Sequence, residues 1–386
     1  MVARIGACFL VCIGALAASL GAQAQVAHRL RSQHGVAAAM AGDIVPESRV
    51  LTTLPAEALA PVTITLDATG PAYQAMTGNP GPATVASVPT LVRPARSIAP
   101  APATLPAGPI QPENFGVNSY QSIYHYSDSL VVAEAQNQAP LRFSGWFRFT
   151  TATGITARCT ASLISRSILV TAGHCVHTGG TGSAGWIRSG TFYPAYRNGE
   201  SPLYGSATAS WVITTGGWFS QGALDQGYDV GLVVLNNRTG TTTEIGDFTG
   251  WFGACFHYCL QNFWHTSQLG FPANYYAGEM LTQSEHLAHS DGRDFVLGSG
   301  MQGGSSGGPH VTNLGALSDS SLDQGRWPTR NIIFGVTSWG YVSDALKIQG
   351  ASSLSGPNET NNFPTMFNYA CATARALHGQ ASCAPI

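Results

Sequence analysis

The stretch "CTASLISRSILVTAGHCVH" (159–177) places an apolar run, "SILVTA" (167–172), directly before a glycine, a histidine and a cysteine. A short run of this kind, bounded by turn residues, predicts a strand. Similar runs, each bounded by Gly, Pro, Asn or Asp, are "RFSGWFRFTT" (142–151), "WIRSGTFYPAY" (186–196), "ASWVITTG" (209–216), "DVGLVVL" (229–235), "NFWHTSQLGF" (262–271), "RDFVLG" (293–298) and "RNIIFGVTSWG" (330–340). Only "PTMFNYACATARALH" (364–378) predicts a helix. Many short strands with turn signals between them indicate an all-β sandwich or barrel with a short C-terminal helix.

Three motifs contain residue types that can act in catalysis: "TAGHC" (171–175), "YDVGLVVL" (228–235) and "GGSSGGP" (303–309). Each taken singly has an ordinary structural explanation. His174 could be a hydrogen-bonded core histidine, and Asp229 could be a turn residue that opens a strand. The glycine run could be a hairpin or a linker.

Together the three motifs meet the demands of nucleophilic acyl transfer. A serine hydroxyl is a poor nucleophile unless an imidazole takes its proton, and the imidazole needs a carboxylate to hold its tautomer. The oxyanion needs backbone N–H donors beside the nucleophile, and glycines allow that backbone to turn inward. The order along the chain is His, Asp, Ser, which is the chymotrypsin-type order.

The stretch 159–177 resembles the trypsin-like serine peptidases, and within them the bacterial branch that includes the V8-type glutamyl endopeptidases. The match covers roughly residues 140–345: the histidine loop (159–177), the aspartate strand (228–235), the nucleophile loop (303–309) and "VTSWG" (336–340) occur in the family's order. The resemblance implies two packed antiparallel six-stranded β-barrels of the chymotrypsin type. It also implies a disulfide between Cys159 and Cys175, which bracket the histidine loop.

The same resemblance assigns a role to each site residue. Ser306, directly before "GGP", would be the nucleophile, His174 the general base and then acid, and Asp229 the residue that orients the imidazole. The backbone N–H groups of Gly304 and Ser306 would form the oxyanion hole. The backbone of Ser338, Trp339 and Gly340 would pair with an extended peptide as an added strand.

Several positions depart from the family pattern. Ser305 stands where relatives that activate by inserting a new N-terminus carry an aspartate, so we expect no such ion pair. Gly300, at the base of the specificity pocket, offers no acid to a Lys or Arg side chain. Met301 and Ser338 stand where the glutamyl branch carries Thr and His. We therefore expect an apolar or small residue at P1, the substrate residue before the scissile bond.

The N-terminal part of the chain differs in composition from the rest. Residues 1–24 contain a basic residue, an apolar run and a small-x-small ending, which is typical of a secretory signal peptide. Residues 25–114 are rich in Pro and Ala and are expected to form a pro-region or linker, with an independent small domain as the alternative. Residues 115–386 would then form the peptidase domain.

Removal of residues 1–24 leaves an even number of cysteines, as a disulfide framework in an exported chain requires. Pairing of neighbours would join Cys159 to Cys175, Cys255 to Cys259 and Cys371 to Cys383, although the sequence alone allows other connectivities. "CFHYC" (255–259) could also be a metal site. Its spacing fits no strong zinc pattern, so a small disulfide loop is favoured and no metal or cofactor is expected.

The charge composition indicates which classes of binding partner are not expected. Charged residues make up 10% of the chain and the net charge is −2, with no basic stripe, so neither nucleic acid nor a stable membrane partner is expected. The sequence predicts a secreted, monomeric serine endopeptidase that acts on proteins or peptides. The alternative is a secreted binding or structural protein that keeps the peptidase scaffold with little or no turnover.

Overall fold

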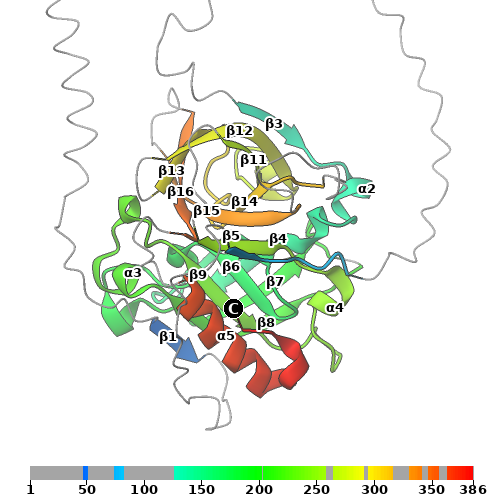
Figure 1. The fold of residues 1–386 in the computed structure, drawn as a ribbon, viewed down its shortest axis with the longest axis vertical. Helices are drawn as coiled ribbons and strands as arrows, with labels where there is room; N and C mark the ends of the chain where they lie inside the picture. Colours follow the sequence, from blue (N-terminus) through cyan, green and yellow to red (C-terminus); the bar gives the residue numbers. More distant parts are fainter. Residues whose placement is uncertain are drawn as a thin grey trace, which may run out of the picture. The chain divides into compact units, whose positions relative to one another are not determined.

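The structure, a computed structural model, describes residues 47–50, 74–81, 126–201, 203–257, 264–290, 294–315, 330–340, 347–355 and 363–385. All of them belong to one unit, which begins at Ile44. Two β-barrels account for most of this unit, one above the other in Figure 1.

The first barrel is built from residues 144–235. Its strands are β4 (Ser144–Thr150), β5 (Thr156–Leu163), β6 (Ile168–Thr171), β7 (Ser189–Pro194), β8 (Ala207–Thr214) and β9 (Gly231–Leu235). They pair in the order β8-β7-β4-β5-β6-β9, and the pairing of β8 with β9 closes the barrel. All residues of β6 and β9 are buried, which explains why these two strands read as continuous apolar runs.

The second barrel is built from residues 264–353. Its strands are β11 (Trp264–Gly270), β12 (Thr282–Ser290), β13 (Asp294–Gly298), β14 (Pro309–Thr312), β15 (Ile332–Gly340) and β16 (Ile348–Ser353). They pair in the order β14-β11-β12-β13-β16-β15, and β14 pairs with β15 to close the barrel. The prediction of two six-stranded antiparallel barrels is therefore confirmed.

Four further strands are added to the outside of these barrels. β1 (Glu47–Val50) pairs with β8, and β3 (Tyr126–Leu130) pairs with β12. β10 (Gly253–His257) runs parallel to β15, and β2 (Gln74–Met76) pairs with β10 on its other side. The sequence analysis placed the residues of β1 and β2 in the pro-region, whereas here their backbones pair with the barrel unit.

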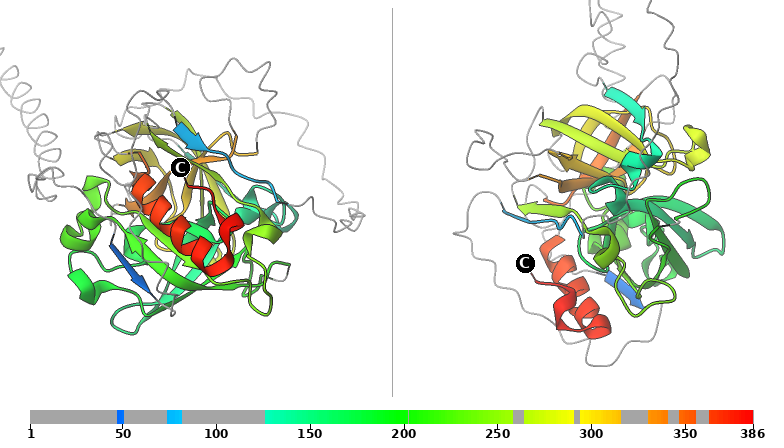
Figure 2. Two further views of the ribbon diagram at one scale, coloured as in Figure 1. Left: turned by 60° about the horizontal axis from the view of Figure 1, so that its bottom comes forward. Right: turned by 90° about the vertical axis from the view of Figure 1, so that its right-hand side faces the viewer.

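Helices are few and mostly short in the described ranges. The C-terminal helix α5 (Phe363–His378) agrees with the predicted 364–378, and it lies against the first barrel (Figures 1 and 2). Most of its large apolar side chains are buried, among them Phe363, Met366 and Phe367, and the His378 imidazole donates to the Leu235 carbonyl of β9 at 2.8 Å. The others are α2 (Ala133–Gln136), α3 (Gly216–Gln221), α4 (Gly246–Thr249) and the 3₁₀ turns η2 (Leu141–Phe143), η3 (Gly173–Cys175), η4 (Gly182–Gly185), η5 (Leu224–Gln226), η6 (Tyr276–Gly278) and η7 (Gln380–Ser382). None of the described helices has the length and apolar character needed to cross a membrane.

The interior of the second barrel contains two histidines. His286 of β12 and His310 of β14 are 2% and 0% exposed, and their ring centroids lie 5.5 Å apart. Neither nitrogen of His286 has a hydrogen-bond partner within the described residues. Burial, and secondarily the charge of His265, lowers the pKa of His286 to about 3. Burial and the charge of His286 lower the pKa of His310 well below its ordinary value. Both rings are therefore neutral at physiological pH.

Candidate active site

His174 and Asp229 meet because the strands that precede and follow them are paired. His174 lies in η3, just after β6, and Asp229 lies just before β9, whose Gly231 pairs with Thr171 of β6. The Asp229 side chain is fully buried. Its Oδ2 accepts from His174 Nδ1 at 2.8 Å and its Oδ1 accepts from the His174 backbone N–H at 2.7 Å. The carboxylate thus fixes both the ring and the backbone of the histidine.

This pairing sets the ionisation of His174. Burial by itself lowers the pKa of the imidazole. The charge of Asp229 and the hydrogen bond to it raise the pKa by more than burial lowers it, so the pKa of His174 lies above 6.5. An imidazole held on Nδ1 by a carboxylate leaves Nε2 as the nitrogen that can take a proton. The pair can therefore act as a general base toward a group near Nε2.

Ser338 contributes a side chain that the sequence analysis did not use. Its hydroxyl donates to Asp229 Oδ2 at 2.6 Å. Ser338 belongs to β15 of the second barrel, so this bond joins the Asp229 carboxylate to both barrels. The sequence analysis assigned the Ser338 backbone to substrate binding. The only sequence signal for the hydrogen bond to Asp229 was the presence of a hydroxyl residue inside the "VTSWG" motif.

The nucleophile loop is anchored to the first barrel by Thr160. The Thr160 hydroxyl donates to the Gly304 carbonyl at 2.8 Å, and the Thr160 N–H donates to the Ser306 carbonyl at 2.8 Å. Gly304 and Gly307 have φ of +99° and +75°, a region that favours glycine. A Cβ on Gly307 would lie 2.0 Å from the Thr171 hydroxyl, so only glycine fits there. This geometry accounts for the dense glycine run.

Backbone N–H groups of this loop are available for a ligand. Within the described residues, neither the Gly304 nor the Ser306 amide has an acceptor. These are the two amides that the sequence analysis assigned to the oxyanion hole. Free N–H groups in a loop held by hydrogen bonds, as this loop is by Thr160, are an arrangement that can stabilise a developing oxyanion.

The two neighbouring serines differ in environment. Ser305 is 2% exposed, and its hydroxyl donates to the Gln302 carbonyl at 2.8 Å. Ser306 is partly exposed, and its hydroxyl makes no hydrogen bond to His174 or to any other described residue. Such contacts are often long in unliganded sites and tighten when substrate binds. Of the two hydroxyl groups, that of Ser306 is the one without a structural partner.

An acidic side chain lies beside Gly300. The Gly300 N–H donates to Asp128 Oδ2 at 3.1 Å, and the Tyr275 hydroxyl donates to the same oxygen at 2.8 Å. A Cβ on Gly300 would lie 2.6 Å from that oxygen. The other oxygen, Oδ1, is buried without a partner among the described residues. The sequence gave no local signal for this acid, since Asp128 is 172 positions away and arrives through the pairing of β3 with β12.

The other predicted substrate-binding residues are Met301, which precedes the nucleophile loop, and Trp339 and Gly340 at the end of β15. Met301 is buried, and its carbonyl accepts from the Gln349 amide at 2.6 Å. The Trp339 indole lies against Gly350 of β16 and donates to Asp294 Oδ2 at 3.3 Å. Gly340 at the end of β15 is exposed. β15 adjoins the nucleophile loop at Thr337, whose carbonyl accepts from the Gly307 N–H at 2.8 Å and whose N–H donates to the Gly308 carbonyl at 2.9 Å, so the exposed end of the strand follows shortly after this contact.

The cysteines form disulfides where the structure describes them. Cys159 is joined to Cys175 and Cys371 to Cys383. Cys255 is disulfide-bonded as well, and Cys259 lies outside the described residues. In the described ranges, the group of potential metal ligands that lie close together is Cys159, His174 and Cys175. Because both of these sulfurs are in a disulfide, they are not thiolates that could bind a metal.

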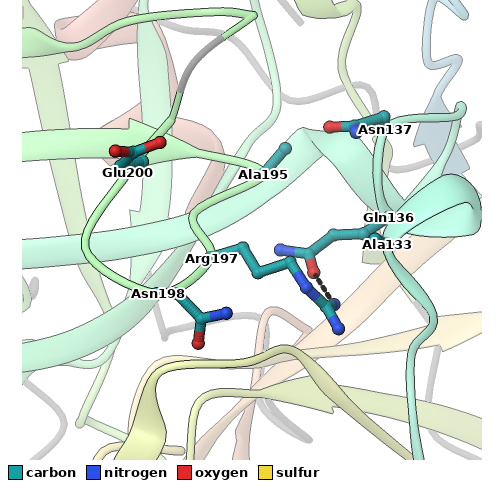
Figure 3. A pocket seen from close by; sticks show the side chains of 7 residues that line it. All are labelled: Ala133, Gln136, Asn137, Ala195, Arg197, Asn198 and Glu200. Atoms are coloured by element: carbon teal, nitrogen blue, oxygen red, sulfur yellow. Dashed lines mark hydrogen bonds between the residues drawn. The ribbon is translucent and has the colours of Figure 1, made fainter.

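A pocket of about 450 Å³ lies elsewhere in the unit (Figure 3). Its lining includes Arg197, Asn198 and Glu200 from the loop after β7, and Gln136 from α2. The Arg197 guanidinium donates to Gln136 Oε1 at 3.1 Å across it. None of the residues that the sequence singled out lines this pocket.

Comparison with known proteins finds similarity to peptidases over part of the chain. Residues 133–255 match the family model described as Trypsin. The extracellular metalloprotease of Bacillus subtilis is 29% identical over 175 residues, which cover 44% of this chain and 51% of that protein. The glutamyl endopeptidase of Bacillus licheniformis is 26% identical over 200 residues, which cover 47% and 59%. The chain thus spans about half the length of the curated relatives it matches.

Solved structures give matches of the same kind. The protease Anisep from Arthrobacter nicotinovorans is 24% identical, with a TM-score of 0.48, and the match covers 60% of this chain and 98% of that one. The resemblance indicated by the sequence motifs is confirmed: residues 133–255 match a trypsin family model, part of the chain is similar to a glutamyl endopeptidase, and the fold consists of two closed six-stranded antiparallel β-barrels.

Proposed function

We propose that this protein is a secreted, monomeric serine endopeptidase. The observation that carries the proposal is the buried Asp229 carboxylate, which holds His174 through two hydrogen bonds. His174 Nε2 takes the proton of the Ser306 hydroxyl as its oxygen attacks the peptide carbonyl, and then delivers that proton to the leaving amine. The Gly304 and Ser306 amides stabilise the tetrahedral oxyanion, and water later hydrolyses the acyl-enzyme by the reverse sequence of proton transfers.

The proposed substrate is a protein or peptide bound in an extended conformation. The end of β15, where Trp339 is half-buried and Gly340 is exposed, follows Thr337, which is hydrogen-bonded to the nucleophile loop, and it offers backbone groups to a substrate. An extended peptide can add to such an edge as a further strand, so that main-chain hydrogen bonds supply affinity. Disulfides in the barrel unit suit an oxidising compartment, in agreement with export.

Two different observations bear on the P1 residue. Gly300 and the buried Met301 favour an apolar or small side chain, as the sequence analysis proposed. The Asp128 carboxylate beside Gly300 favours a basic side chain instead, because its Oδ1 is buried without a partner. Cleavage-site sequencing on a protein mixture separates the two, with Asp128→Asn as the matched variant. Loss of cuts after Lys and Arg in this variant supports the basic preference, and unchanged cuts after apolar residues support the other.

The activity is tested with a fluorophosphonate probe and casein. The wild-type protein is expected to be labelled and to digest casein, and Ser306→Ala is expected to do neither. Ser305→Ala is the matched control and should keep both properties, since the Ser305 hydroxyl is bonded to Gln302. Equal labelling of Ser306→Ala and wild type would refute the assignment of the nucleophile. A folded wild type without turnover would favour the alternative, a binding protein on this scaffold.

A further inference from the structure

Residues 74–81 are hydrogen-bonded into the barrel unit along their length. The backbone of β2 pairs antiparallel with β10, with Met76 opposite Ala254. Next along the chain, Asn79 and Trp251 exchange two backbone hydrogen bonds, of 2.9 and 2.7 Å. The Met76 side chain packs against the main hydrophobic core. This segment therefore has the pairing and packing of an ordinary sheet strand.

A buried cation also depends on the segment. Arg142 is 2% exposed, and its Nη2 donates to the Pro80 carbonyl at 2.7 Å while its Nε donates to the Thr249 carbonyl at 2.6 Å. A buried guanidinium needs an acceptor for each donor that water no longer reaches. Loss of residue 80 would remove one of these acceptors from the interior.

The fit between the segment and the barrel unit is tight at Gly78. A Cβ on Gly78 would lie 2.5 Å from the Gly253 nitrogen and 2.6 Å from the Trp251 carbonyl oxygen. Both contacts are backbone atoms, which cannot move aside as a flexible side chain can. The surface formed by Trp251 and β10 therefore accepts an extended peptide only where glycine occupies this position.

We propose that residues 74–81 are a permanent strand of the peptidase unit. Cleavage of the chain on both sides of them leaves them bound, without a covalent link, to Trp251, β10 and Arg142. The partner for this surface is thus an extended, glycine-containing segment of the chain itself. This separates residues 74–81 from the removable pro-region to which composition alone assigns them.

The test uses the full chain with Ser306→Ala, so that the result does not depend on peptidase activity. Two recognition sequences for a site-specific peptidase are inserted, one between residues 51 and 73 and one between residues 82 and 125. After cutting, the piece that carries residues 74–81 is expected to co-elute with the barrels in gel filtration at low micromolar concentration. Release of the piece in the native buffer, whether or not the barrels stay folded, overturns the proposal.

Two substitutions in residues 74–81 test whether retention of the piece depends on the fit at Gly78. Gly78→Val should lower the retained fraction on the order of tenfold, because its side chain meets fixed backbone. Thr77→Ala is the matched control and should retain the piece, since Thr77 is exposed. If Gly78→Val fails to fold, amide hydrogen exchange of the uncut chain tests the proposal instead. Protection of the Asn79 amide by at least about a hundredfold over a free peptide is expected, and exchange at the free-peptide rate contradicts the proposal.

Discussion

The buried histidine His286 should make the second barrel sensitive to acid. Its pKa is about 3 in the folded protein and about 6.5 when the chain is unfolded. Between these values the unfolded chain binds a proton that the folded protein does not, so stability falls as pH falls through 6.5 and levels off near 3. At pH 4.5 the difference of about two pKa units corresponds to a loss of about 3 kcal/mol relative to pH 7.5. His310, with its lowered pKa, contributes in the same direction.

The measurement is urea unfolding of the Ser306→Ala protein at pH 7.5 and 4.5, followed by tryptophan fluorescence. His286→Leu removes the titrating ring, so its loss of stability between the two pH values should be smaller by about 3 kcal/mol. His265→Gln is the control. Because the His265 side chain is 69% exposed, this variant should keep most of the acid loss. An identical pH dependence for His286→Leu and its parent would show that His286 is not buried as a neutral ring.

Four further predictions concern the candidate site. Because the pKa of His174 is raised, the acid limb of the kcat/KM profile is expected above pH 6.5. Asp229→Asn should lower kcat by about 10⁴-fold, while circular dichroism shows that the fold persists. Ser338→Ala removes one hydrogen bond to a buried carboxylate, so kcat/KM should fall by about 10- to 100-fold with KM nearly unchanged, and a fall below tenfold would limit its role to packing. Gly307→Ala should lower the free energy of unfolding by about 3 kcal/mol or more, measured by thermal unfolding, because its Cβ would lie 2.4 Å from the Thr160 carbonyl oxygen.

Strands with buried, apolar character were predictable from the sequence. β6, β9, β13 and β15 lie within predicted runs, because a strand buried among barrel residues reads as Val, Ile, Leu and Phe bounded by turn residues. β12 was not predicted, since "TQSEHLAHS" is mostly polar. Its polar character has a physical reason, because the barrel interior there accommodates His286 and Ser284 as buried polar side chains.

The sequence indicated candidate site residues where the motif is local, and it did not indicate contacts between residues that are distant in the chain. The order of His174, Asp229 and Ser306 suggests the roles proposed for them, since each lies in a short stretch with a recognisable pattern. Asp128 and Thr160 act across 172 and 144 positions of the chain. Such contacts depend on strand register and barrel docking, which residue patterns do not encode. Likewise, the composition of residues 74–81 indicated a pro-region or linker, and their pairing as a strand depends on the backbone of β10.

The hydrogen bond from Ser338 to Asp229 has a consequence for the order of events during synthesis. Each barrel closes on itself, so the first can complete its own sheet before the second has left the ribosome. At that stage His174 and Asp229 are paired, but Ser338 and Ser306 are still to come. The proposed catalytic machinery is completed only when the late barrel docks on the early one. Until then the chain lacks Ser306, the proposed nucleophile, and the Asp229 carboxylate lacks the hydrogen bond from Ser338.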